Sequence, residues 1–257
     1  MRINHNIAAL NTHRQMGVNN AAQAKSMEKL ASGQRINRAA DDAAGLSISE
    51  KMRGQIRGLD QASRNAQDGI SLIQTAEGAL NEVSDMLVRM KELNVQKANQ
   101  TNNTEDTDNI NLELDALGDE VDNILTNTKF NGKAVFSNSF DIRISDDDTT
   151  KLTVAAATVT KTTGLDNTKN VAAIEDAINE INKQRATYGS QQNRLEHTIN
   201  NLNATSENLT AAESRIRDTD MAKEMMNQTK NSILSQAAQA MLAQANQAPQ
   251  GVLQLLR

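Results

Sequence analysis

The stretch from Val171 to Ile216, VAAIEDAINEINKQRATYGSQQNRLEHTINNLNATSENLTAAESRI, decides the fold class of this chain. Large residues recur in it at unbroken steps of seven, and a second set precedes each of them by three positions. The first set is Ile174, Ile181, Tyr188, Leu195, Leu202, Leu209 and Ile216, and the second is Val171, Ile178, Arg185, Gln192, Ile199, Ser206 and Glu213. This is the heptad pattern of a coiled coil, sustained over roughly 70 Å of helix. It predicts a long helix that packs against partner helices along one seam.

Two more helices in the first half of the chain carry matching apolar stripes. One stripe consists of Ala66, Ile73, Leu80 and Leu87 with Gly69, Ala76, Val83 and Met90, widened by Leu72, Ala79, Met86 and Leu93. A stripe of that width needs more than one partner helix. The other helix is expected from Glu105 to Leu125, with Thr104 as its cap. The predicted fold is therefore mainly α, a long coiled-coil-like helical bundle.

The pattern changes between residues 129 and 168. Asn131-Gly132 is a strong hairpin-turn signal. Apolar residues then alternate with polar ones at Phe140, Ile142 and Ile144, and the alternation resumes at Leu152 and Val154. This predicts a small β-hairpin region in the middle of the chain.

Both ends of the chain predict Ala-rich helices, from Ile3 to Ala31 and, after a break at Asp218 to Asp220, from Met221 to Gln247. The central bundle can close without them, so we expect the end helices to pair with one another or with other molecules. We therefore expect residues 1–44 and 219–257 to form one discontinuous domain of terminal helices and residues 45–218 to form a separate helical bundle domain.

The C-terminal tail carries no charge between Lys230 and Arg257. That length could span a bilayer, but it holds six glutamines, and Pro249-Gln250-Gly251 is expected to interrupt any helix. We therefore expect no membrane insertion. Amides and alanines suit a protein–protein seam, although the tail folding onto its own bundle is an open alternative.

Composition and motifs argue against an enzyme or a nucleic-acid binder. The chain has no cysteine, and His5, His13 and His197 lack ligand-spaced carboxylates, so we expect no metal, cofactor or catalytic residue. The acidic run at residues 146–148 lacks the spacing of a calcium loop. A net charge of -5 speaks against binding nucleic acid. The first fifteen residues contain no cleavable secretory signal.

Several runs closely resemble bacterial flagellin of the Gram-positive bacillus type. They are MRINHNIAALNT at the N-terminus, the run from Leu30 to Leu80, ESRIRDTDMAKEM, and AQANQAPQGVLQLLR at the C-terminus. The resemblance covers about the first 136 and the last 85 residues. It implies a structural subunit of the extracellular flagellar filament, used for swimming motility. It also implies that residues 1–44 and 219–257 form an inner coiled-coil domain and residues 45–218 an outer one.

The resemblance also implies partners. These are further copies of the chain in a helical homopolymer, the flagellar type III export apparatus, a secretion chaperone, a second assembly factor, the filament cap and hook-associated proteins. Export by that apparatus would need no cleaved signal peptide. The tail is expected to be disordered in the single chain, covered by the chaperone before export, and helical in the filament.

The resemblance assigns roles to three sets of residues. Contacts with an innate immune receptor, Toll-like receptor 5, are assigned to Arg89, Leu93 and Glu113, in a run that departs from the usual one at Asn94 and Lys97. The terminal interface between subunits is assigned to Ile3, Ile7, Leu10, Ile233, Leu234, Met241, Leu242, Val252, Leu253, Leu255 and Leu256. The chaperone-binding set is Ile233, Leu234, Met241, Leu242, Val252, Leu253, Leu255 and Leu256.

Other interpretations of the same residues remain open. A hook–filament junction protein would share the terminal helices but form only a short ring. An intracellular helical adaptor would share the heptads. A flagellin with an inserted protease domain is excluded, because residues 137–170 are too few to hold one.

Overall fold

The computed structural model describes residues 6–147, 149–155 and 162–255, with the backbone alone from residue 248 onward. Its elements are α1 (Ile7–Ser32), α2 (Ala43–Lys97), α3 (Thr104–Asn127), β1 (Lys129–Phe130), β2 (Lys133–Ala134), β3 (Phe140–Arg143), β4 (Lys151–Val154), α4 (Val171–Arg217) and α5 (Met221–Leu255). The chain divides into two units. Unit 1 comprises Met1–Gly54 and Leu209–Arg257, and unit 2 comprises Gln55–Asn208.

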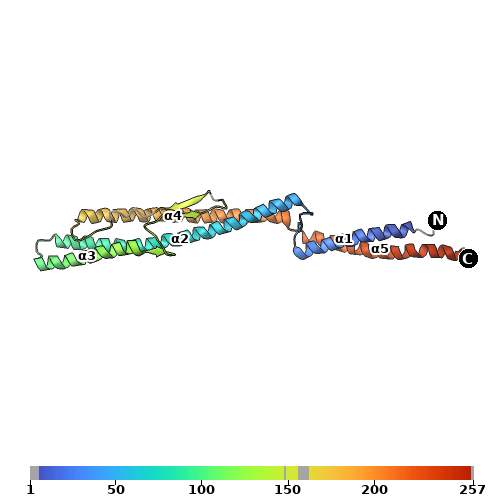
Figure 1. Ribbon diagram of the computed structural model, residues 1–257, viewed down its shortest axis with the longest axis horizontal. Coiled ribbons are helices and arrows are strands. Elements are labelled where there is room, and N and C mark those ends of the chain that lie inside the picture. The colour runs from blue at the N-terminus through green and yellow to red at the C-terminus, as the bar shows by residue number, and fades with distance from the viewer. Residues whose placement is uncertain (1–5, 148, 156–161, 256–257) are drawn as a thin grey trace. The chain divides into compact units, whose positions relative to one another are not determined.

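Unit 2 is built on the predicted heptad stripes. Its helices lie side by side, with the strands against them (Figure 1). The core residues come from both long stripes and from α3: Ala66, Leu72, Ile73, Ala76, Leu80, Val83, Leu87, Met90, Leu93, Ile110, Leu114, Val121, Leu125, Ile174, Ala177, Ile181, Tyr188 and Leu195. Burial at steps of three and four residues is what keeps three long helices in contact. The prediction of a mainly helical, coiled-coil-like bundle is confirmed.

Helix α3 begins one residue earlier than expected and has a different cap. Asn103 accepts a hydrogen bond from the Asp106 backbone N–H at 2.7 Å, and the Asp106 carboxylate accepts one from the Asn103 backbone N–H at 3.3 Å. This reciprocal pair is a capping box, which satisfies two backbone donors at once. The expectation that Thr104 caps the helix is wrong, because Asn103 is placed to make both bonds.

Two short antiparallel hairpins follow α3, as predicted. In the first, Asn131 and Gly132 both have positive φ, 49° and 78°, which is the backbone that a tight two-residue hairpin turn requires. In the second, β3 pairs with β4 so that Ile142 lies opposite Leu152. Both of these side chains are buried against the helices, so the second hairpin closes one side of the core.

Residues 162–170, which lead into α4, are held against α3 by carboxylates. Asp122 accepts from the backbone N–H of Gly164, and Asp115 accepts from both the backbone and the side-chain amide of Asn167, each at 2.9 Å. Leu165, only 3% exposed, lies directly over Gly118, where a Cβ atom would overlap the Leu165 carbonyl oxygen. The glycine in α3 therefore permits this close approach of two backbones.

In unit 1, α1 and α5 lie side by side, and the start of α1 lies next to the end of α5 (Figure 1). The pairing of the two end helices with each other is therefore confirmed. Helix α1 starts at Ile7 rather than at Ile3, because Asn6 is its N-cap: the side-chain oxygen accepts from Ala9 N at 3.1 Å. Ile3 lies outside the described residues.

Helices α4 and α5 are separated at residues 218–220, as predicted. Two expectations about the rest of α5 are wrong. Pro249-Gln250-Gly251 does not interrupt the helix, and the backbone of the single chain is helical, not disordered, as far as Leu255. Proline lacks only its own N–H and pushes away the carbonyl four residues earlier, so a helix continues through it when that carbonyl finds another donor.

Candidate assembly interface

The seam between α1 and α5 is made of small and polar side chains. Among the side chains described on these two helices, the buried ones are Asn19, Ser26, Ser235 and Ala238. The Ser235 hydroxyl donates a hydrogen bond to the Asn20 side-chain oxygen at 2.7 Å. Small residues allow two helices to approach closely, but they remove little apolar surface from water.

Most of the large apolar side chains described on the same two helices face outward, although Met16 and Leu30 are half-buried. Among those assigned to the interface, Leu10 is 71% exposed, Ile233 60%, Met241 59% and Ile7 56%. Leu234 is also exposed and Leu242 is half-buried. Other exposed large apolar residues on these helices, which the sequence prediction missed, are Val18, Met27, Met221, Met225 and Met226. Of the remaining assigned residues, Val252, Leu253 and Leu255 lie on the helical backbone, and Leu256 lies outside the described residues.

Outward-facing apolar side chains on both helices of a pair are unusual for a chain that stays single. Monomeric proteins rarely expose contiguous apolar patches larger than a few hundred Å². Completely burying one such side chain stabilises the buried state by about 1.5–3 kcal/mol. Because the α1–α5 pair buries mainly small residues, its large apolar side chains remain available to surfaces beyond the pair.

The turn between α1 and α2 is fixed by one carboxylate. Asp41 forms an ion pair with Lys25 at 2.7 Å and accepts backbone hydrogen bonds from Asn37 and Arg38. The hydrogen bond from Lys25, followed by that from Arg38, lowers the pKa of Asp41 to about 2. Asp41 therefore stays charged at neutral pH and holds the turn in one conformation.

A group of hydrogen bonds and an ion pair joins the two chain segments of unit 1, and sequence reasoning missed it. The Arg35 guanidinium donates to the carbonyl oxygen of Ile216 at 2.6 Å. Arg217 donates to Gln34 at 3.2 Å and forms an ion pair with Glu50 at 2.5 Å. Arg35 and Arg217 lie far apart in the sequence, so nothing in their local spacing indicated that their segments would meet.

The three residues assigned to the immune receptor lie close together but differ in exposure. Arg89 donates two hydrogen bonds to one oxygen of Glu113, at 2.9 and 3.0 Å, and a third to Glu92 at 3.2 Å. The Glu113 carboxylate raises the pKa of Arg89 above its ordinary value. Leu93 is only 2% exposed and belongs to the core. Arg89 and Glu113 are therefore available on the surface, whereas Leu93 is not.

The two departures in that run are both used in packing. Asn94 is 7% exposed, and its side-chain nitrogen is buried without a hydrogen-bond partner. Lys97 donates to the carbonyl oxygen of Asn167 at 2.8 Å, which adds a third tie to the segment over α3. Lys97 is therefore held by its own chain.

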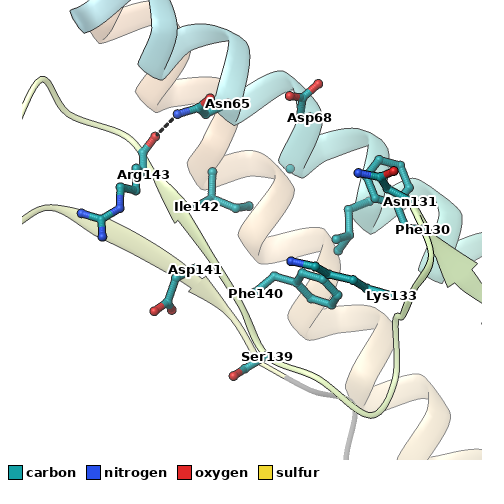
Figure 2. A pocket seen from close by; sticks show the side chains of 12 residues that line it. Asn65, Asp68, Phe130, Asn131, Lys133, Ser139, Phe140, Asp141, Ile142 and Arg143 are labelled. Carbon is teal, nitrogen blue, oxygen red and sulfur yellow. Dashed lines mark hydrogen bonds between the residues drawn. The ribbon is translucent and has the colours of Figure 1, made fainter. Parts of the chain in front are cut away.

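One hollow of about 390 Å³ lies between α2 and the hairpins (Figure 2). Ile142 points toward the helices, whereas Asp141 and Arg143 point away from them, and Asn65 donates to the Arg143 carbonyl at 3.2 Å. Lys151 and Thr153 donate hydrogen bonds to the Asp141 carboxylate and lower its pKa. All three residues lie on the second hairpin, so the lowered pKa is explained by contacts within that hairpin. The residues lining the hollow form no acid–base pair suited to catalysis.

The rest of the described chain offers no catalytic or metal constellation. Residues 6–147, 149–155 and 162–255 contain no group of three or more His, Asp or Glu side chains placed to hold a metal ion. No helix within the same ranges is both long and apolar enough to cross a membrane.

The fold and this surface define a class of protein: a helical chain whose ends pair with each other and present large apolar side chains outward. Residues 3–141 match the bacterial flagellin N-terminal helical region, and residues 171–256 match the bacterial flagellin C-terminal helical region. The chain belongs to the flagellin family.

Relatives in that family are similar over the full length. The chain is 51% identical to the flagellin of Bacillus subtilis and 54% identical to that of Halalkalibacterium halodurans, with all of each chain covered. It is 46% identical to the flagellar filament 33 kDa core protein of Treponema phagedenis, again with full coverage. A crystal structure of Bacillus cereus flagellin, 36% identical, matches 58% of this chain and 94% of its own with a TM-score of 0.50.

Proposed function

We propose that this protein is the structural subunit of a bacterial flagellar filament, an extracellular helical homopolymer used for swimming, and that it has no catalytic role. The observation that carries the proposal is the outward placement of large apolar residues on α1 and α5, around a seam of small ones. The names of the relatives, flagellins and a flagellar filament core protein, agree with it.

Assembly of this kind needs two different surfaces on each subunit. An open helix of subunits grows when one patch meets an unlike patch on the next copy. The α1–α5 pair offers an apolar face on each helix, through Leu10 on α1 and Ile233 and Met241 on α5. We propose that Val252, Leu253, Leu255 and Leu256 belong to the same subunit interface, and that residues 1–44 and 219–257 form the inner part of the filament.

The same apolar face requires protection before assembly. We propose that a secretion chaperone covers the C-terminal set until the unfolded chain passes through the flagellar type III apparatus. The set comprises Ile233, Leu234, Met241, Leu242, Val252, Leu253, Leu255 and Leu256. A second assembly factor, the filament cap and hook-associated proteins complete the proposed set of flagellar partners.

We further propose that Arg89 and Glu113 contact Toll-like receptor 5. Both side chains are about half exposed, at 50% and 46%, and they are held together by an ion pair. The two of them present one compact charged feature on α2 and α3. Leu93, the third proposed contact, is only 2% exposed, so it offers the receptor little surface of its own.

A truncation tests the main proposal. Removing residues 252–257 deletes four large apolar side chains while leaving unit 2 intact, so we expect an unchanged thermal unfolding transition for unit 2 but no polymerisation. Q254A, which keeps all four, is the matched control and is expected to polymerise. Electron microscopy and sedimentation after seeding with filament fragments measure the result. Filaments of normal length from the truncated chain would refute the proposal, and growth that stops at a short ring would indicate a junction protein instead.

A further inference from the structure

The carbonyl group of Ala245 is the feature of α5 that Pro249 leaves without its helical partner. In a helix, this carbonyl would accept a hydrogen bond from the backbone N–H of residue 249. Proline has no such N–H, and its ring also pushes the carbonyl four residues earlier away from the helix axis. Helix α5 nevertheless continues to Leu255, so another donor has to satisfy this group.

That donor comes from the other terminal helix. The side-chain nitrogen of Asn6 donates to the Ala245 carbonyl oxygen at 2.6 Å. The other atom of the same amide, the side-chain oxygen, accepts from Ala9 N at 3.1 Å and caps α1. One amide therefore both starts α1 and completes α5, and each of its two ends faces a group of the opposite hydrogen-bonding type.

The position of Asn6 agrees with the register of the whole pair. Gln228 donates to the Met27 sulfur, and Ser235 donates to Asn20, so the two helices run antiparallel. In this antiparallel arrangement the first residues of α1 lie beside the C-terminal part of α5, so Asn6 lies next to Ala245. Both residues are half-buried, so water has only partial access to the Ala245 carbonyl group. The hydrogen bond from Asn6 therefore contributes to stability even though water competes with it.

We propose that Asn6 is a positioning residue for assembly: its amide replaces the hydrogen bond that Pro249 cannot make, and so fixes the register of the terminal pair and carries α5 on to the tail. This inference rests on the proposed function, because the tail that it positions is the segment proposed to join neighbouring subunits. Pro249 leaves the Ala245 carbonyl oxygen without a donor from its own helix. Asn6 reaches this oxygen only when α1 and α5 pair in the correct register.

A double-mutant cycle tests the role of Asn6. N6S keeps a good N-cap but is too short to reach Ala245, whereas P249A restores the helical N–H. We expect N6S to raise the critical concentration for polymerisation about fivefold, the factor that one ordinary hydrogen bond provides. In the P249A background the same substitution is expected to change it by less than about twofold, because the carbonyl no longer needs Asn6. The matched control is N20S, which removes the bond from Ser235 and should not be suppressed by P249A.

Hydrogen exchange on the soluble chain gives a second measurement that does not need filaments. N6S should speed exchange of the backbone amides in residues 250–255 about fivefold, and P249A should reverse the change. Equal exchange in wild type and N6S, or an N6S effect that P249A leaves intact, would overturn the role of Asn6. Failure of the wild-type chain to polymerise at any concentration would instead overturn the proposed function, while the exchange measurement still decides the role of Asn6.

Discussion

Replacing Gly118 by alanine sets two opposite effects against each other. Alanine favours a helix over glycine by about 0.8–1.0 kcal/mol, so propensity alone predicts that G118A stabilises α3. The structure predicts the reverse. A Cβ atom at this position would overlap the Leu165 carbonyl oxygen, which belongs to a neighbouring backbone rather than to a movable side chain.

The size of the effect follows from what residues 162–170 would lose. The Leu165 oxygen would have to move by more than about 1 Å to reach normal packing distance. Displacing Leu165 forfeits part of a burial contribution of about 1.5–3 kcal/mol. It also weakens the bonds that Asp115, Asp122 and Lys97 make to this segment, at about 0.5–1.5 kcal/mol each. After the gain in propensity, we expect a net loss of about 2–4 kcal/mol in the free energy of unfolding.

Urea unfolding of the soluble chain, followed by far-ultraviolet circular dichroism, measures this loss. The matched control is G78A on α2, where a Cβ atom meets nothing within 4 Å and where propensity should act alone. We expect G78A to stabilise the chain by about 0.5–1 kcal/mol. A G118A chain that unfolds at the same urea concentration as wild type, or at a higher one, would refute the close-approach argument.

Two further predictions concern ion pairs. The lowered pKa of Asp41 means that its charged form stabilises the fold above about pH 4 and loses this contribution as the pH falls toward about 2. The melting temperature of wild type should therefore exceed that of D41N at neutral pH and approach it near pH 2, whereas a constant difference would contradict the role of the Lys25 bond. For Arg89 and Glu113, about half exposed, R89A and E113Q should each leave the melting temperature nearly unchanged, because water and salt screen exposed ion pairs. In cells reporting Toll-like receptor 5 activation both should lower the response, and an unchanged response would contradict the proposed contact.

The helical bundle could be predicted because burial repeats along the sequence. Each step of seven from Ile174 to Leu202 places another side chain in the same seam, so many positions indicate one structure. The hairpin at Asn131-Gly132 was predictable for a different reason, since few residue pairs adopt two successive positive φ values. Both signals are local, and both are confirmed.

The features that sequence reasoning missed depend on contacts between distant segments. Whether Pro249 ends a helix is decided by Asn6, at the other end of the chain. Gly118 was not recognised as a contact point because Leu165 approaches it from a loop with no periodic pattern. Leu10 and Ile233 were assigned to the subunit interface from the family resemblance, but their exposure and the small-residue seam between their helices appear only when α1 and α5 are paired.

The small-residue seam of α1 and α5 has a consequence for how this protein melts. Under the proposed assembly, neighbouring copies stabilise this pair, so its stability follows mass action and rises with the logarithm of protein concentration. Unit 2, which encloses its own apolar core, has no such dependence. A dilute solution and a concentrated one of the same chain therefore differ in the stability of the ends alone, and a melting temperature for unit 1 is defined only at a stated protein concentration.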